Sequence, residues 1–264
     1  MLELKGIYKT FNAGTVNEKR AIDNLNLTLE NGDFVTIIGG NGAGKSTTLN
    51  LIAGVFPVDA GTINLNGFNL THLPEHKRAK YLGRVFQDPM MGTAATMGIE
   101  ENLALAYRRG QRRGLHAGIT NEERKLYREK LATLGLGLED RMTSKVGLLS
   151  GGQRQALTLL MASLKQPKLL LLDEHTAVLD PKTAAKVLTL SDQIVQENRL
   201  TTLMITHNMK DAIAHGNRLI MMDAGRVVVD ISGEEKKKLT VPDLLALFSS
   251  ASGSTEANDK LLLS

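Results

Sequence analysis

Residues 39–47 have the sequence GGNGAGKST, and residues 149–153 have the sequence LSGGQ. The first stretch fits the pattern G-x-x-x-x-G-K-S/T, a loop whose backbone N–H groups surround the phosphates of a nucleotide. It follows the apolar run 34–38, which is typical of a buried strand, and it precedes a predicted helix over residues 45–53. Strand, loop and helix therefore come in the order that a phosphate-binding loop requires.

The residue types of this loop suit a nucleoside triphosphate and a metal ion. Glycines let the backbone turn tightly and bring N–H groups onto the phosphates, and the helix N-terminus adds partial positive charge. Lys45 can reach the β- and γ-phosphates, and the Ser46 hydroxyl can bind Mg²⁺. The residues expected to contact ATP are Gly39, Asn41, Gly42, Ala43, Gly44, Lys45, Ser46 and Thr47. A glycine-rich turn without a ligand is the alternative.

The LSGGQ stretch offers a second anion-binding helix start. Ser150, Gly151 and Gly152 can expose a hydroxyl and backbone N–H groups before an apolar helix expected to begin near Gln153. Alone, the pentapeptide could be no more than a helix cap. Together with the phosphate loop, it resembles the nucleotide-binding subunits of the ATP-binding cassette (ABC) family, whose signature motif it is. The resemblance implies that these four residues of one copy close over ATP held by the phosphate loop of another, in a head-to-tail dimer.

Composition and charge limit the class of protein. The chain has 264 residues, 42% of them hydrophobic and 23% charged, which is ordinary for a globular protein with a sizeable core. It contains no cysteine, which excludes disulfides and thiolate metal sites. No apolar run approaches the roughly 18–20 residues that cross a bilayer, and residues 1–11 show no apolar signal region. With a net charge of only +4, we expect no nucleic-acid partner.

The pattern of apolar residues predicts an α/β fold. Alternation through the first thirty residues predicts half-buried antiparallel strands, and uninterrupted apolar runs predict buried parallel ones. Helical patterns predominate between residues 90 and 145, including a helix capped by Thr120. We therefore expect a P-loop NTPase core with a mostly parallel sheet, an N-terminal antiparallel β subdomain and an inserted helical subdomain.

We expect four parts along the chain. The N-terminal β region and the phosphate-loop half of the ATP-binding core span residues 1–87, and the helical subdomain with the signature motif spans 88–165. The second half of the core spans 166–248, and residues 249–264 have the small, polar composition of a flexible tail.

A second constellation follows the apolar run 169–172, which Asp173 and Glu174 immediately succeed. At the end of a parallel strand, Asp173 can hold Mg²⁺ through water, and Glu174 can polarise the water that attacks the γ-phosphate. Two such acids could also cap a turn. By resemblance they are the Walker B aspartate and the catalytic glutamate. His175 stands where the family more often has proline, a change expected to affect loop stiffness.

Four further residues take their expected roles from the resemblance. Gln87 resembles the Q-loop glutamine, which contacts Mg²⁺ and links the nucleotide to the transmembrane partner. His207 resembles the switch histidine that contacts the γ-phosphate, although a histidine at a strand end can also be an ordinary polar residue. Asp180 resembles the D-loop aspartate and can equally cap the following helix. Phe11 resembles the A-loop aromatic that stacks on adenine, with Tyr8 as a rival.

Three other features are expected to be structural. The basic stretches 108–113 and 236–238 are predicted to be solvated, although basic clusters can also meet lipid headgroups. The apolar stripe formed by Leu157, Leu160, Met161 and Leu164 has helical spacing and is predicted to be core.

The resemblance extends from residue 2 to about residue 248 and implies an ATPase that energises transport by a separate membrane permease. Residues 96–103 resemble those of amino-acid-type importers. The implied cofactors are ATP and Mg²⁺, and the implied partners are a second copy, transmembrane permease subunits and a solute-binding protein. The implied location is peripheral, at the cytoplasmic face of the cell membrane. The alternatives are a soluble ABC-type ATPase in iron–sulfur cluster assembly and a regulatory module that binds ATP without hydrolysis, against which Glu174 and His207 argue.

Overall fold

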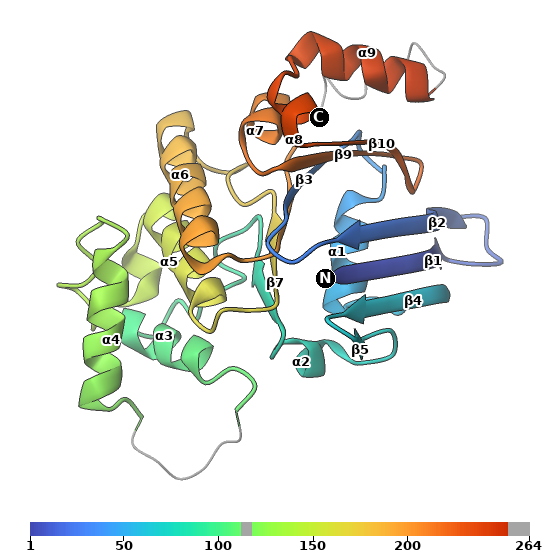
Figure 1. Cartoon of the computed structure of the whole chain (residues 1–264). Helices are drawn as coiled ribbons and strands as arrows, with labels where there is room; N and C mark the ends of the chain where they lie inside the picture. The colour runs from blue at the N-terminus through green and yellow to red at the C-terminus, as the bar shows by residue number, and fades with distance from the viewer. Residues whose placement is uncertain (112–117, 253–264) are drawn as a thin grey trace. The chain divides into compact units, whose positions relative to one another are not determined.

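The structure is a computed structural model that describes residues 1–111 and 118–252 (Figure 1). The chain forms two compact units. Unit 1 combines residues 1–78 with the residues from Leu200 onward, and unit 2 comprises residues 79–199. Within the described residues, no helix has both the length and the apolar character needed to cross a membrane.

Unit 1 contains an antiparallel sheet and a set of mainly parallel strands, as expected. The antiparallel sheet has the order β2-β1-β4-β5, formed by β1 (Leu2–Phe11), β2 (Lys19–Leu29), β4 (Ala60–Leu65) and β5 (Phe68–Asn69). The other set has the order β10-β9-β3-β8, formed by β3 (Phe34–Ile38), β8 (Thr202–Ile205), β9 (Arg218–Asp223) and β10 (Arg226–Ser232). Strand β3 runs parallel to β8 and β9, and every residue of β3 is buried, which explains its continuous apolar sequence.

Helix α1 (Lys45–Ala53) has the bounds predicted from the sequence. The other helices described in unit 1 are α2 (Glu75–Arg78), α7 (Met209–Ala214), α8 (Gly233–Lys237) and α9 (Val241–Ser252). Helix α9 buries Leu244 and Phe248 in a cluster with Leu219 and Met221 of β9. It therefore continues through residues 249–252 of the predicted tail, whereas residues 253–264 lie outside the described part of the chain.

One expectation in unit 1 is wrong for a single residue. Residues 236–238 were expected to form a solvated basic face; Lys237 and Lys238 are exposed, but Lys236 is only 1% exposed. Its Nζ donates hydrogen bonds to the carbonyl oxygens of His215 and Gly216, the latter at 2.9 Å. These carbonyls follow the end of α7, where backbone acceptors have no helical partner. The lysine is buried because its charge satisfies that helix end, a long-range pairing that a local charge run does not reveal.

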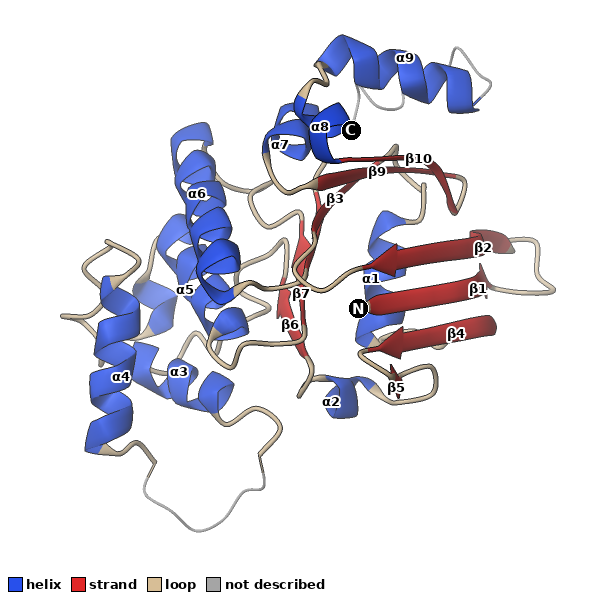
Figure 2. Ribbon diagram, in the orientation of Figure 1, coloured by secondary structure: helices blue, strands red, loops and turns tan. Residues whose placement is uncertain are grey.

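Unit 2 combines two parallel strands with a group of helices (Figure 2). Its elements are β6 (Leu82–Val85), α3 (Ile99–Tyr107), α4 (Asn121–Ala132), the 3₁₀ turn η1 (Val146–Leu148), α5 (Gly151–Ser163), β7 (Leu169–Asp173) and α6 (Pro181–Asn198). Thr120 caps α4 by accepting a hydrogen bond from the Glu123 N–H, as predicted. Of the predicted apolar stripe, Leu157, Leu160 and Met161 are buried in α5, and Leu164 at its C-cap is partly buried. Residues 112–117, which include two arginines of the predicted basic loop, lie outside the described residues.

Candidate nucleotide site

The glycines of the phosphate loop are required by close backbone contacts. Gly39 has φ +153°, and a Cβ built on it would lie 2.2 Å from the carbonyl oxygen of Met222. Gly44 has φ +100°, and its Cβ would lie 2.8 Å from the carbonyl oxygen of Ala21. Any larger residue would displace the loop from β9 and β2. The loop is therefore held close to these two strands immediately before the N-terminus of α1.

Lys45, the first residue of α1, directs its charge into the same loop. The residue is 7% exposed, and its Nζ donates hydrogen bonds to the carbonyl oxygens of Gly39 at 2.6 Å and Gly40 at 3.2 Å. Ser46 is exposed at the start of the helix, where first-turn N–H groups have no helical acceptors. A buried ammonium, backbone donors and an exposed hydroxyl match what a phosphate chain requires.

Phe11 and His207 lie in the same unit as the loop. Phe11 ends β1 and is partly buried, with its ring packed edge-to-face on Phe56 at a centroid distance of 5.1 Å. His207 is exposed just beyond β8, whose Ile205 pairs in parallel with Ile37 of β3. The histidine and the phosphate loop therefore follow the same ends of neighbouring strands, as expected for groups that share a ligand.

The carboxylates belong to unit 2. Strands β6 and β7 are parallel with Val85 opposite Leu172, so Gln87 and the Asp173–Glu174 pair follow the same strand ends. Gln87 is exposed. Glu174 has φ +44°, a left-handed conformation that turns the chain sharply after the buried strand.

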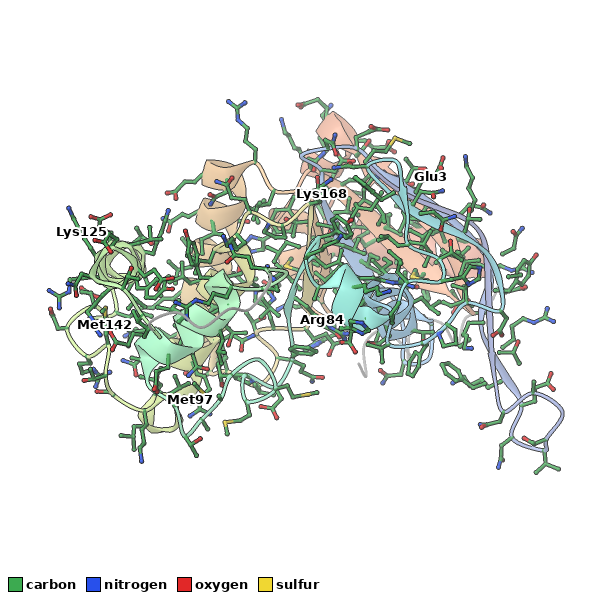
Figure 3. The ribbon with its side chains drawn as sticks, turned by 90° about the horizontal axis from the view of Figure 1, so that it is seen from below. Glu3, Arg84, Met97, Lys125, Met142 and Lys168 are labelled. Atoms are coloured by element: carbon green, nitrogen blue, oxygen red, sulfur yellow. The ribbon has the colours of Figure 1, made fainter. Side chains whose placement is uncertain are left out.

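Asp173 is already engaged by a residue that the sequence analysis did not single out. The Nη2 of Arg84 on β6 lies 3.1 Å from the Asp173 carboxylate, and both side chains are largely buried. The Arg84 guanidinium also lies 4.6 Å from the ring centroid of Phe86. Figure 3 labels Arg84 on β6 and Lys168 just before β7. The sequence offered one indication of this buried ion pair, because Arg84 is the single basic residue in the otherwise apolar strand β6.

The arrangement of acidic residues restricts how a metal could bind. Within the described residues, no group of three histidine, cysteine, aspartate or glutamate side chains is close enough to hold a metal ion. Mg²⁺ commonly binds through one or two carboxylates together with substrate phosphates and water. A carboxylate such as Asp173 or a hydroxyl such as Ser46 therefore suits Mg²⁺ only as one ligand beside nucleotide phosphates and water, and not as part of a permanent protein-only metal centre.

His175, next to Glu174, is 1% exposed and anchors the turn to helix α6. Its Nε2 lies 2.9 Å from the hydroxyl of Ser191, and that hydroxyl donates to the carbonyl oxygen of Val187 at 2.9 Å. The histidine tautomer decides which of the two groups donates in this contact. This contact gives a physical basis for an effect on loop stiffness, which stays a prediction.

The signature motif forms a capped helix start packed against the next motif. The Ser150 hydroxyl accepts from the Gln153 N–H at 3.3 Å, and the Gln153 side chain accepts from the Ser150 N–H at 3.2 Å. This cap starts α5 at Gly151, slightly earlier than predicted. A Cβ on Gly152 would lie 2.1 Å from Thr183 Cγ2 on α6, so only glycine fits there.

Asp180 caps α6 in the same region. Its carboxylate accepts from the Thr183 N–H at 3.1 Å, and hydrogen bonds from Thr183 lower the pKa of Asp180 below its usual value. The helix-capping alternative is therefore correct for Asp180, and its D-loop role stays a prediction.

Comparisons with known proteins give the family. The sequence profile of the ABC transporter family matches residues 22–177, more than half of the chain. The chain belongs to the ABC transporter family. A tyrosine transport ATP-binding protein of Clostridioides difficile (strain R20291) is 45% identical over 248 residues, which cover 94% of this chain and 98% of that protein. A spermidine/putrescine import ATP-binding protein of Haemophilus influenzae (strain ATCC 51907 / DSM 11121 / KW20 / Rd) is 33% identical, covering 89% of this chain and 59% of that protein.

Solved structures agree with the assignment. A dimeric ATP-binding cassette in a post-hydrolysis state, bound to ADP and phosphate, has a TM-score of 0.75 and 30% identity, covering 88% of this chain and 98% of that chain. A cassette of an ABC transporter in its ADP conformation has a TM-score of 0.75 and 25% identity, covering 94% of this chain and 98% of that chain. The chain is therefore an ABC ATPase with the P-loop α/β architecture, and it energises solute import. Cassettes of this family bind ATP, dimerise and work with membrane components.

Proposed function

We propose that the chain drives uptake of an amino-acid-type solute through a separate permease. The observation that carries this proposal is the 45% identity to a tyrosine transport ATP-binding protein over nearly the whole of both chains. The resemblance of residues 96–103 to amino-acid-type importers supports the same cargo class. A solute-binding protein would complete such a system, and the subunit would sit peripherally at the cytoplasmic face of the membrane.

Each motif has a role in the proposed hydrolysis. Lys45 and the loop N–H groups hold the triphosphate, and Phe11 stacks on the adenine. Glu174 polarises the attacking water, while His207 donates to the γ-phosphate. Mg²⁺, when bound, neutralises charge on the phosphate oxygens; the residues that would hold it are Ser46, Gln87 and Asp173.

In the proposed dimer, a second copy completes the site. Its Ser150 and the N–H groups of Gly151, Gly152 and Gln153 face the ATP held by the first copy, and Asp180 communicates between the copies. Support comes from α5, a helix of 13 residues whose N-terminus carries no acidic side chain in its first turn.

The stretch after Gln87 is the proposed contact with the permease. Met90 is 45% exposed and Met91 is 69% exposed, which is unusual for adjacent large apolar residues. Methionine side chains adapt to irregular partner surfaces, which suits a groove that receives part of a membrane protein.

The double variant Met90→Asp/Met91→Asp tests this function in the complete transporter. We expect loss of permease co-purification and of ATP-driven amino-acid uptake into proteoliposomes, because a buried interface would have to desolvate unpaired carboxylates. ATP binding by the isolated subunit should stay near wild type. Phe68→Asp is the matched control, since Phe68 is 47% exposed on β5. Full uptake by the double variant would contradict this docking surface. Failure of the wild-type chain to recover any permease would favour the soluble ATPase, and absent turnover would favour the regulatory module.

A further inference from the structure

A second lysine lies beside the phosphate loop. Lys19 begins β2, and a Cβ built on Gly42 of the loop would be only 3.3 Å from the Lys19 Nζ. In the antiparallel β1–β2 pair, Lys19 is the direct partner of Phe11. The Lys19 side chain therefore extends from the backbone position opposite Phe11, the candidate for stacking on adenine, to the phosphate loop. All of these residues belong to unit 1.

The charge environment of Lys19 differs from that of neighbouring cations. Arg226 lies 2.5 Å from Asp23, Arg20 lies 3.4 Å from the same carboxylate, and Lys9 lies 2.8 Å from Asp59. Across residues 1–111 and 118–252, Lys19 takes part in no such ion pair. The cation is thus uncompensated at a surface of glycine backbone, which raises the local positive potential.

We propose that Lys19 is a nucleotide-binding residue that contacts the polyphosphate of ATP as a second ammonium, besides Lys45. The inference rests on the proposed ATP site and adds one residue to it. Its position between Phe11 and Gly42 matches the path of a nucleotide whose base stacks on the first and whose phosphates meet the loop. Lys45 is buried and bound to loop carbonyls, whereas Lys19 is exposed.

This difference in exposure predicts a distinct dependence on ligand charge and on salt. An exposed ammonium attracts the phosphate charges of ATP and ADP more strongly than that of AMP. It makes no such electrostatic contribution to the binding of adenosine, which has no phosphate. Its contribution is screened when the Debye length falls from about 10 Å at 0.1 M salt to about 3 Å at 1 M salt. The buried Lys45 is screened far less.

The test compares Lys19→Met with wild type in full-length protein that also carries Glu174→Gln, so that ATP is not consumed. Titration calorimetry would measure the Kd for ATP and adenosine at low and high salt. We expect Lys19→Met to weaken ATP binding about fivefold at low salt, by much less at high salt, and to leave adenosine binding unchanged. Lys19→Arg should restore most of the affinity, because the charge is kept.

Lys5→Met is the matched control, since Lys5 is an exposed lysine of β1 paired with Glu3. It should not change ATP affinity. Equal ATP affinity of Lys19→Met and wild type would overturn the proposal, as would an equal loss for ATP and adenosine. If the parent protein, which keeps Lys19, bound no ATP at all, the proposed ATP site itself would be overturned. That outcome is distinct from a loss that is absent in Lys19→Met, so the experiment separates the two proposals.

Discussion

Glu174 combines a strained backbone with a tightly held neighbour. Its φ of +44° costs energy for a residue with a Cβ, and such strain persists only where the surroundings impose it. The buried strand β7 precedes it, and the His175–Ser191 hydrogen bond fixes the residue that follows. The carboxylate therefore leaves a turn fixed on both sides, as a general base that must meet one water molecule requires.

Glu174→Gln should keep ATP binding and lose most turnover. The amide preserves size and turn geometry but polarises water weakly, and loss of a general base typically costs about 10²–10⁴ in rate. We expect phosphate release to fall at least about a hundredfold, while a dimer accumulates with ATP in size-exclusion chromatography. Glu197→Gln, an exposed change on α6, is the control. Unchanged phosphate release in Glu174→Gln would remove Glu174 from the catalytic role.

The role proposed for such a residue rests on the sequence alone where it depends on neighbours in sequence. Glycine, lysine and serine in one loop, or two acids after an apolar run, indicate their roles within a few residues. The partners of those residues were not predictable. Arg84 meets Asp173 through the register of β6 and β7, and Ser191 meets His175 through helix packing. Neither contact can be predicted from the residues that are adjacent in sequence.

At the scale of elements, α4 carries an unsatisfied buried group. Tyr127 is fully buried, and its ring packs edge-to-face on Tyr107 at a centroid distance of 6.0 Å. Within the described residues its hydroxyl has no hydrogen-bond partner. Burial, with a smaller effect from Glu123, raises the pKa of Tyr127 to about 12. The helix thus keeps a group that destabilises it, because the ring itself fills core space.

Tyr127→Phe should raise the free energy of unfolding by about 1 kcal/mol at neutral pH, since it removes an unsatisfied buried hydroxyl while keeping the ring. The unfolded phenol ionises near pH 10, below its folded pKa. Ionisation therefore favours the unfolded state, and wild-type stability should fall as pH rises from about 10 towards 12. Urea titrations across this range should show a smaller fall for Tyr127→Phe. Tyr107→Phe is the control, and parallel pH curves for Tyr127→Phe and wild type would contradict the assignment.

Helices and strands with strong periodicity were predictable, and short elements were not. Helix α1 has the predicted bounds because the phosphate loop and Gly54 delimit its apolar pattern. Strand β5, helix α2 and helix α8 are too short for a period to emerge, and they form because tertiary contacts hold them. Arg78 illustrates this: buried at the end of α2, it donates to the carbonyl oxygens of Leu51 and Ile52 at 2.7 and 2.8 Å.

For the whole molecule, each unit carries a different share of the ATPase chemistry. Unit 1 contains the phosphate loop, Phe11 and His207, whereas unit 2 contains the carboxylates and the signature motif. Ser150 and Gln153 cap the signature helix start reciprocally, whereas the N–H groups of Gly151 and Gly152 have no acceptor within the helix. This helix start is thus preformed as a surface that a second copy can present, and in the proposed dimer that copy completes the site.

Cysteine crosslinking between copies tests this assembly, and the chain offers a clean background because it contains no cysteine. Asn41→Cys lies beside Gly42, and Gly151→Cys lies in the signature motif; both positions are exposed. Each variant would be made singly with Glu174→Gln, and the two would be mixed with or without ATP before oxidation. Head-to-tail dimers should give a covalent product of twice the chain mass only in the mixture, increasing with ATP, because bound phosphates attract the signature N–H groups of the other copy. Each variant alone should give little product. A yield that is independent of ATP, or equal in the unmixed samples, would contradict the head-to-tail arrangement.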